Sequence, residues 1–266
     1  MTKKGQVAIV GYGYVGKSMQ KIFPDAIIYD VKGIGSKNEV NQNAELAIVC
    51  VPTPPREDGA CDTSIVEEVI SWLSAPLILV KSTVEPGTTD SFSNRYKKSI
   101  CFSPEYVGES KYFVPPWKYP DPLDPRLHGF FIVGGEKSAA ERIVQIFQRK
   151  LGPDAVYRIT NAKTAELTKY IENSWGATKV MFANEFYDIA NKLGVSYSEL
   201  RELWLLDKRV ERMHTAVFLD ERGITGKCFP KDVSAIVKTA EAFGYDSKLL
   251  KAVLTKNLEY YPEDKK

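Results

Sequence analysis

A glycine-rich turn between a short strand and a helix is the feature that most restricts the fold of this chain. The apolar run 6–10 is typical of a β-strand, and Gly11-Tyr12-Gly13-Tyr14-Val15-Gly16 follows it at the start of a helical stretch over 14–23. In such a turn the first glycine permits the tight bend, the second lets the backbone approach a pyrophosphate, and the third lets helix and strand pack closely. The helix N-terminus favours an anion. The six residues of the turn therefore predict a dinucleotide site.

Short apolar runs alternate with amphipathic stretches through the first 160 residues. The expected strands cover residues 6–10, 26–29, 46–51, 77–80, 100–102, 130–133 and 155–159. Helical patterns lie between them at 14–23, 64–73, 88–97 and 139–151. This alternation predicts an α/β fold, a doubly wound Rossmann-type parallel sheet with helices on both faces.

From residue 161 onward the pattern is helical only. No proline occurs between residues 161 and 193, and apolar residues recur there at helical spacing, so we expect one long connecting helix. Further helical patterns cover 198–206, 233–243 and 247–260. We therefore predict two domains, a dinucleotide-binding domain over residues 1–160 and an all-helical domain over residues 161–266.

Charge, hydropathy and cysteine usage exclude several classes of protein. The formal net charge of +2 is too small to predict nucleic acid or an anionic membrane as the main partner. The longest apolar run, residues 46–51, is far shorter than the roughly 20 residues that span a bilayer. The N-terminus has no signal-peptide pattern. The four cysteines lack metal-ligand spacing, which predicts no metal site, and thiols in a chain of this size favour the cytoplasm.

An acidic residue follows the second expected strand. Asp30 lies 19 residues after Gly11, where a carboxylate can accept hydrogen bonds from the adenosine ribose hydroxyls and repel a 2′-phosphate. This favours NAD over NADP, although Lys32 nearby weakens the exclusion of NADP.

One cysteine differs from the other three in its surroundings. Two of the others lie inside apolar runs and are interpreted as buried hydrophobes, while Cys61 lies in a polar loop without an assigned role. Cys228 is flanked by Lys227 and Lys231 and lies next to the start of an expected helix. Positive charge and a helix N-terminus both favour the thiolate. Cys228 is therefore a candidate nucleophile.

Six motifs in order make nearly the whole sequence resemble the nucleotide-sugar 6-dehydrogenase family, which includes UDP-glucose and GDP-mannose dehydrogenases. The motifs are GYGYVG at 11–16; Val51-Pro52-Thr53-Pro54 with Asp58-Gly59 and Asp62; Lys81-Ser82-Thr83-Val84 with Pro86-Gly87-Thr88; Ser103-Pro104-Glu105-Tyr106-Val107 with Glu109; Ala165-Glu166-Leu167 with Lys169, Asn173, Lys179 and Asn184-Glu185; and GKCFPKD at 226–232, preceded by Asp207 and Arg209.

The resemblance implies an NAD-dependent oxidation of the C6 hydroxyl of a nucleotide sugar, with two NAD per turnover. The expected substrate is UDP-glucose, and the expected product is UDP-glucuronate. Cys228 would attack the intermediate aldehyde, and the thiohemiacetal would be oxidised to a thioester that is then hydrolysed. An aldehyde offers no alkoxide that can donate a hydride until a nucleophile adds to it, which is why a dehydrogenase of this kind needs a cysteine.

The resemblance also implies roles for the residues around the cysteine. Lys169 and Asn173 would stabilise oxyanion character, and their spacing of four places both on one face of the long helix. Asp232 would hold Lys169 and an ordered water, which Thr83 would help to place. Glu105 would act as the general base for water attack on the thioester.

Further contacts follow from the matched motifs. The cofactor is expected to contact, besides the glycine turn and Asp30, the residues Lys32, Val51, Pro52, Thr53, Ser82 and Thr83. The substrate is expected to contact Glu105, Tyr106, Val107, Glu109, Lys169, Asn173 and Arg209; an alternative role for Glu109 is to orient a loop. Arg209 matches a position that in the family reaches into the neighbouring subunit's site, which implies a homodimer through the helical domain.

The sequence departs from the family pattern in two places. Family members continue after the helical domain into a third, Rossmann-like domain that closes over the substrate nucleotide, whereas this sequence ends at residue 266, so we expect a short form without that domain. The loop after Glu105 reads Gly108-Glu109-Ser110-Lys111, and the approach to the cysteine over residues 223–227 contains fewer glycines than is usual in the family.

Two other functions stay open at this stage. A β-hydroxyacid dehydrogenase-type single oxidation would use Lys169 and Asn173 but needs no cysteine, so the motif around Cys228 argues against it. A shortened, non-catalytic protein would bind NAD or a nucleotide sugar without turning it over. An argument against this interpretation is that all five matched site residues are present: Glu105, Lys169, Asn173, Cys228 and Asp232.

Overall fold

The computed structural model describes residues 5–107 and 124–260, which divide into two compact units. Within these ranges the first unit extends to Lys169 apart from residues 57–60, and the second contains those four residues and everything from Tyr170 onward. Helix α6 (Ala162–Lys192) begins in the first unit and continues in the second. None of the described helices is a candidate for crossing a membrane, since none combines the length with the apolar composition that this requires.

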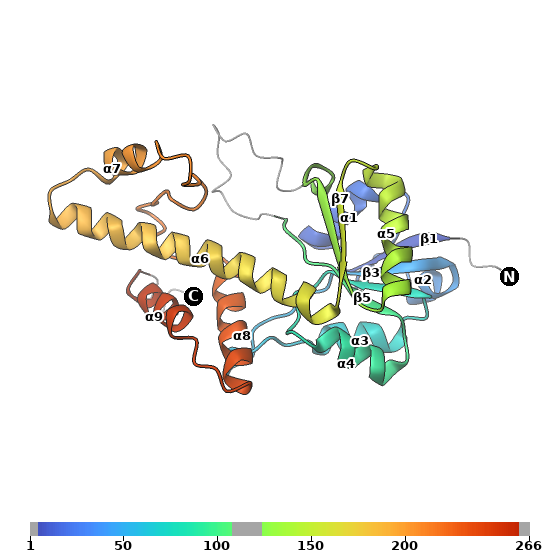
Figure 1. The fold of residues 1–266 in the computed structure, drawn as a ribbon. Helices are drawn as coiled ribbons and strands as arrows, with labels where there is room; N and C mark the ends of the chain where they lie inside the picture. Colours follow the sequence, from blue (N-terminus) through green and yellow to red (C-terminus); the bar gives the residue numbers. More distant parts are fainter. Residues whose placement is uncertain (1–4, 108–123, 261–266) are drawn as a thin grey trace. The chain divides into compact units, whose positions relative to one another are not determined.

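A seven-stranded sheet forms the centre of the first unit (Figure 1). The strands are β1 (Gln6–Val10), β2 (Ile27–Tyr29), β3 (Ala44–Val49), β4 (Leu77–Val80), β5 (Ile100–Phe102), β6 (Phe130–Gly134) and β7 (Val156–Thr160). They are arranged in the order β2-β1-β3-β4-β5-β6-β7, so that β1 lies between β2 and β3. The strand order reverses at this point, and doubly wound sheets bind their ligands beyond the carboxyl ends of the strands there.

Helices cover both faces of this sheet, which confirms the predicted fold class. α1 (Tyr14–Ile22) and α5 (Lys137–Leu151) bury Met19, Ile143 and Phe147 on one face. α2 (Lys37–Asn43), α3 (Ser64–Trp72) and α4 (Thr88–Tyr96) contribute to the cluster on the other face. The sequence pattern missed α2, because its only buried residue is Val40 and a single apolar position has no period.

One strand pair departs from the predicted parallel sheet. β6 pairs antiparallel with β5 at Phe102 and Gly134, whereas every other pairing of neighbouring strands is parallel. A parallel neighbour needs a crossover connection along one face of the sheet. In the described part of the β5–β6 connection the only regular element is the three-residue 3-10 helix η1 (Pro125–Leu127). The predicted irregular segment 111–126 lies mostly outside the described residues.

All regular elements in the described part of the second unit are helices, and the predicted long helix is confirmed as α6. It is followed by α7 (Tyr197–Trp204), α8 (Cys228–Ala242) and α9 (Lys248–Tyr260). A small core packs Val180 and Met181 of α6 against Val233 of α8 and Val253 of α9.

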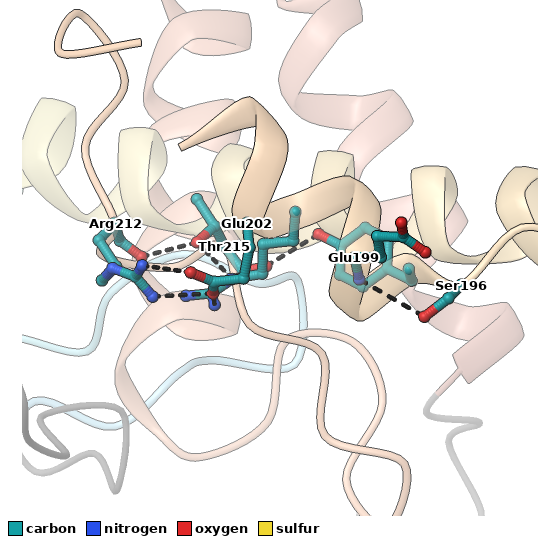
Figure 2. Close-up of polar contacts among 7 residues, drawn as sticks. Ser196, Glu199, Glu202, Arg212 and Thr215 are labelled. Carbon is teal, nitrogen blue, oxygen red and sulfur yellow. Dashed lines mark hydrogen bonds and ion pairs between the residues drawn. The ribbon is translucent and has the colours of Figure 1, made fainter. Parts of the chain in front are cut away.

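Polar contacts fix α7 and the segment that follows it (Figure 2). Ser196 caps the helix by accepting a hydrogen bond from the Glu199 N–H. The Arg212 guanidinium lies opposite the Glu202 carboxylate at 2.6 Å, and the Thr215 hydroxyl donates to the Arg212 carbonyl oxygen at 2.7 Å. These bonds anchor the beginning of the segment that leads to Cys228.

Candidate active site

The glycine turn has the geometry that its sequence predicts. Gly11 has a φ of +93°, and a Cβ there would lie 2.7 Å from the carbonyl oxygen of Cys50. A Cβ on Gly16 would lie 2.1 Å from the carbonyl oxygen of Gly11, so α1 can pack this closely on β1 only with glycine. A Cβ on Gly13 would have no atom within 4 Å. The protein itself therefore does not require glycine at position 13, whereas a ligand close to the backbone would.

The surroundings of this turn fit a dinucleotide. No acidic residue stands in the first turn of α1 and no side chain caps it, so its N–H groups can bind a pyrophosphate. Asp30 accepts hydrogen bonds from the N–H groups of Tyr12 at 2.7 Å and Lys32 at 2.9 Å. These two bonds lower the pKa of Asp30, and the ionised carboxylate suits ribose hydroxyls. Lys32 itself is exposed.

The remaining predicted cofactor residues lie beyond the carboxyl ends of β3 and β4. The Ser82 hydroxyl donates to the Val51 carbonyl oxygen at 2.7 Å and so ties the two strand ends together. Thr53 is buried, Thr83 is half-buried and Pro52 is exposed. In the glycine turn, Tyr12 and Val15 are half-buried and Tyr14 is 63% exposed.

A buried ion pair joins the segment after β5 to the first turns of α6. The Lys169 ammonium lies 3.1 Å from a carboxylate oxygen of Glu105 and donates to the Glu105 carbonyl oxygen at 2.8 Å. The other carboxylate oxygen accepts from the Val107 N–H at 2.9 Å. The same ammonium lies 5.7 Å from the centre of the Tyr106 ring. Four of the predicted substrate residues thus lie together in the first unit.

The ionisation of Glu105 is set by opposing effects. Burial alone would raise its pKa, but the Lys169 charge, the Val107 N–H and the Lys81 charge outweigh burial, and the pKa of Glu105 lies below its ordinary value. Glu105 is therefore a carboxylate at neutral pH, the form that a general base requires.

Sequence reasoning assigned no role to two buried charged residues of the first unit, Lys81 and Glu166. Lys81 is 5% exposed, and its ammonium donates to the Ser103 hydroxyl at 3.2 Å and to the Pro104 carbonyl oxygen at 2.8 Å. The available signal was its position, since a lysine that directly follows four buried apolar residues of a central strand cannot easily reach water.

Glu166 is fully buried at the start of α6 and holds the loop that follows β4. Its carboxylate accepts hydrogen bonds from the N–H groups of Gly87 and Thr89, at 2.5 and 2.8 Å. Burial raises the pKa of Glu166, although these N–H groups oppose the effect. Since Lys169 lies one helical turn further along α6, this contact ties the part of α6 that carries Lys169 to Gly87 and Thr89.

In the second unit, Asn173 and Asp232 form a buried polar pair. The Asn173 amide donates to the Asp232 carboxylate at 2.5 Å, and the two residues are 5% and 1% exposed. The Lys231 ammonium lies 2.6 Å from the other carboxylate oxygen of Asp232. Asn173 follows Lys169 by one turn of the same continuous helix. The roles predicted for these residues are not tested by this geometry and stay predictions.

Cys228 is the first residue of α8 and is exposed, whereas Cys50, Cys61 and Cys101 are buried. The expected helix start beside Cys228 is therefore present, five residues earlier than its apolar pattern indicated. Pro230 falls in the first turn, where its missing N–H costs no helical hydrogen bond. Cys61 lies outside the helices and strands, as expected, but it is 1% exposed and its thiol donates to the Thr83 carbonyl oxygen.

The residue after the cysteine is held by a glycine of α6. A Cβ on Gly176 would lie 2.6 Å from the Phe229 ring and 3.2 Å from the His214 ring. These two rings meet edge to face with centres 5.4 Å apart. Burial lowers the pKa of His214 to about 4, so the imidazole is neutral at pH 7. Gly176 thus provides the space that positions the start of α8.

Two predicted substrate residues remain, Glu109 and Arg209. Glu109 lies outside the described residues. The Arg209 side chain is 90% exposed and pairs with Asp207 at 2.6 Å. Among the described residues, no group of three or more histidine, cysteine or carboxylate side chains is arranged to hold a metal ion.

Comparison with known proteins places this geometry in a family. Two profiles of the UDP-glucose/GDP-mannose dehydrogenase family match the chain, the NAD binding domain over residues 35–115 and the central domain over residues 163–259. The chain belongs to the UDP-glucose/GDP-mannose dehydrogenase family. The resemblance predicted from the motifs is confirmed, and so is NAD as the cofactor of the first unit.

Individual relatives agree with this assignment. UDP-glucose 6-dehydrogenase of Rickettsia bellii is 32% identical over 253 residues, which are 91% of this chain and 56% of that protein. The Rickettsia felis enzyme is 35% identical over 235 residues, 83% of this chain and 49% of that protein. The structure of a UDP-glucose dehydrogenase from Pyrobaculum islandicum has a TM-score of 0.78 and 26% identity, and the match covers 97% of this chain and 69% of that chain. The chain spans about half the length of the curated relatives it matches.

Proposed function

We propose that this chain is an NAD-dependent oxidoreductase that converts the C6 hydroxyl of a nucleotide sugar to a carboxylate in two oxidations. The observation that carries the proposal is the setting of Cys228, the only exposed cysteine of the described residues, at the N-terminus of α8. Relatives named UDP-glucose 6-dehydrogenase support UDP-glucose as the substrate.

Bound NAD would accept the hydride in each oxidation. At the first oxidation the Lys169 ammonium would stabilise the negative charge that forms on the C6 oxygen as it loses its proton. The Cys228 thiolate would then add to the aldehyde carbon, and this adduct is the species that the second oxidation converts to a thioester. Water adds to the thioester carbon as Glu105 takes its proton, and the carbon–sulfur bond breaks. The sugar leaves as a carboxylate and Cys228 regains its thiolate.

We propose that residues 1–160 serve as the NAD-binding domain and that residues 161–266 carry the catalytic cysteine and a homodimer contact. A stripe of apolar side chains on α6, 40–73% exposed, supports the dimer: Ile171, Trp175, Phe182, Phe186, Ile189 and Leu193. Their spacings of three, four and seven place them along one side of the helix. An apolar stripe of this length is typical of a protein interface.

The test is a count of NADH formed per nucleotide sugar. We expect two NADH per UDP-glucose from the unsubstituted protein, and Cys228→Ser to lower acid formation by roughly a thousandfold or more, the scale expected for loss of a covalent nucleophile. Cys101→Ala, which removes a buried thiol of β5, is the matched control and should retain two NADH.

Three outcomes would contradict the proposal. Binding of NAD and nucleotide sugar without NADH would indicate the non-catalytic alternative. One NADH per β-hydroxyacid, unchanged by Cys228→Ser, would indicate the β-hydroxyacid dehydrogenase alternative, which uses Lys169 and Asn173. Two NADH from GDP-mannose but none from UDP-glucose would replace the substrate while leaving the chemistry in place.

A further inference from the structure

Lys81 connects the ends of two neighbouring strands of the first unit. It directly follows β4, and its backbone N–H donates to the Val49 carbonyl oxygen at 2.8 Å. Its side chain extends to the residues after β5 and donates to the Ser103 hydroxyl and the Pro104 carbonyl oxygen. Glu105 is the next residue. Lys81 therefore braces the backbone that carries the proposed general base.

The Lys81 ammonium is also a buried charge that needs compensation. The side chain is almost inaccessible to water, and the ammonium lies 5.8 Å from the centre of the Phe131 ring. Burial lowers the pKa of Lys81 to about 8, and the Glu105 carboxylate opposes that effect. At pH 7 the ammonium is therefore still charged, and Glu105 is the carboxylate that stabilises this charge.

Two cations and one anion meet among the described residues of this cluster. Lys81 and Lys169 are cations and Glu105 is the one anion among the three. Burial raises the pKa of the neighbouring Cys50 thiol to about 12, so Cys50 adds no charge. His128 and Tyr106 line the same small cavity as Lys81 and Glu105. Lys169 alone with Glu105 would form a neutral pair, and a neutral pair stabilises an oxyanion poorly. Lys81 places a second positive charge beside this pair.

We propose that Lys81 is a positioning residue for the Glu105–Lys169 pair: it braces the Ser103–Pro104 backbone, and its charge adds to that of Lys169 in keeping Glu105 ionised for the activation of water. This inference rests on the proposed function, in which Lys169 stabilises the oxyanion and Glu105 activates water. A purely structural lysine would brace the backbone without acting on the charge of Glu105, so a measurement of that charge separates the two roles.

The test compares Lys81→Met with Lys98→Met. Methionine has nearly the length of lysine without its charge. Lys98 is a matched control, since its ammonium donates to the backbone carbonyl oxygens of Ile70 and Ser71 and pairs with no carboxylate in the described contacts. The ionisation of Glu105 is followed by NMR of protein labelled with ¹³C at the glutamate carboxyl carbon, and the Glu105 signal is assigned by its loss in Glu105→Gln.

Because a neighbouring cation stabilises the carboxylate, its loss should move the titration of Glu105 to higher pH in Lys81→Met and leave it unchanged in Lys98→Met. The acid limb of kcat for NADH formation should move in the same direction, since the base must be ionised. At pH 7 we expect kcat to fall about tenfold with KM for the sugar nearly unchanged, as for loss of an interaction made only in the transition state.

The unsubstituted protein provides a second measurement, which does not depend on a variant that folds. The Glu105 signal should show a further shift as Lys81 loses its proton near pH 8. A shift caused by His128 would disappear in His128→Asn, whereas a shift caused by Lys81 would persist in that variant, so the variant separates the two sources. Absence of the shift, or an unchanged Glu105 titration in Lys81→Met, would overturn the inference. If no nucleotide sugar yields NADH, the proposed function fails while the Glu105 titration still decides the role of Lys81.

Discussion

In the first unit, apolar side chains fill two clusters of 18 and 16 buried residues on the two faces of the sheet, whereas the main core of the second unit contains six. The second unit instead leaves a stripe of large apolar side chains exposed along α6. A sheet covered by helices on both faces buries its hydrophobic side chains within its own unit. A helix with an exposed apolar stripe buries it only against another surface. The first unit therefore buries its own apolar surface, whereas the exposed stripe of the second supports the proposed dimer.

The same contrast applies to how each unit positions its functional residues. In the first unit, close backbone contacts leave little freedom, as between Gly16 and the carbonyl oxygen of Gly11. In the second unit, the start of α8 depends on contact between Gly176 and the Phe229 ring, and a ring can move when a backbone cannot. For this reason we expect a glycine substitution in the first unit to have a larger effect on stability than one in the second.

The largest effect is expected for Gly16→Ala in the first unit. The new Cβ would meet a backbone oxygen, so α1 must move away from β1, and we expect the free energy of unfolding to fall by about 3 kcal/mol or more. Gly13→Ala is the matched control, since its Cβ meets open space and stability should change by less than about 0.5 kcal/mol. Urea unfolding and NAD titration check both. We expect Gly13→Ala to weaken NAD binding, since only a ligand requires glycine there. Full NAD affinity in Gly13→Ala, or unchanged stability in Gly16→Ala, would contradict the assigned roles of these two glycines.

A smaller effect, on association rather than folding, is expected for Phe182→Glu in the α6 stripe. A buried carboxylate at the centre of an apolar interface should weaken the dimer about a hundredfold, the range of an interface hot spot. Asn191→Glu adds the same charge on the other side of α6 and should leave association unchanged. Sedimentation equilibrium measures both dissociation constants. An unsubstituted protein that stays monomeric at high concentration would remove the comparison between the units.

The smallest effect is expected for Gly176→Ala. Alanine favours the helix by about 1 kcal/mol over glycine, but its Cβ must displace the Phe229 ring, and we expect a net loss of about 1 kcal/mol. The displacement should also change the rate at which Cys228 reacts with a thiol reagent. Gly176→Ala combined with Phe229→Leu relieves the contact and should recover stability. Unchanged stability and reactivity in Gly176→Ala would show that the ring adapts freely.

Local pattern was sufficient to predict most elements of both units. All seven strands and the long helix appear within a few residues of their predicted bounds, because buried strands and amphipathic helices have short periods that any stretch of sequence displays. The glycine turn and Asp30 could be placed for the same reason, since both belong to one local strand–turn–helix unit. The flanking lysines and the expected helix start made Cys228 a candidate, and the family motifs added Glu105 and Lys169.

What the sequence determined by itself was therefore the set of elements, the dinucleotide turn and the candidate side chains of the proposed chemistry. The tertiary structure decided the antiparallel pairing of β6, the burial of Lys81 and Glu166, and the contact of Gly176 with Phe229. Each of these depends on residues far apart in the chain, whose proximity is set by how whole elements pack. Pairing direction, desolvation and close approach are properties of that packing, and no local period of the sequence encodes them.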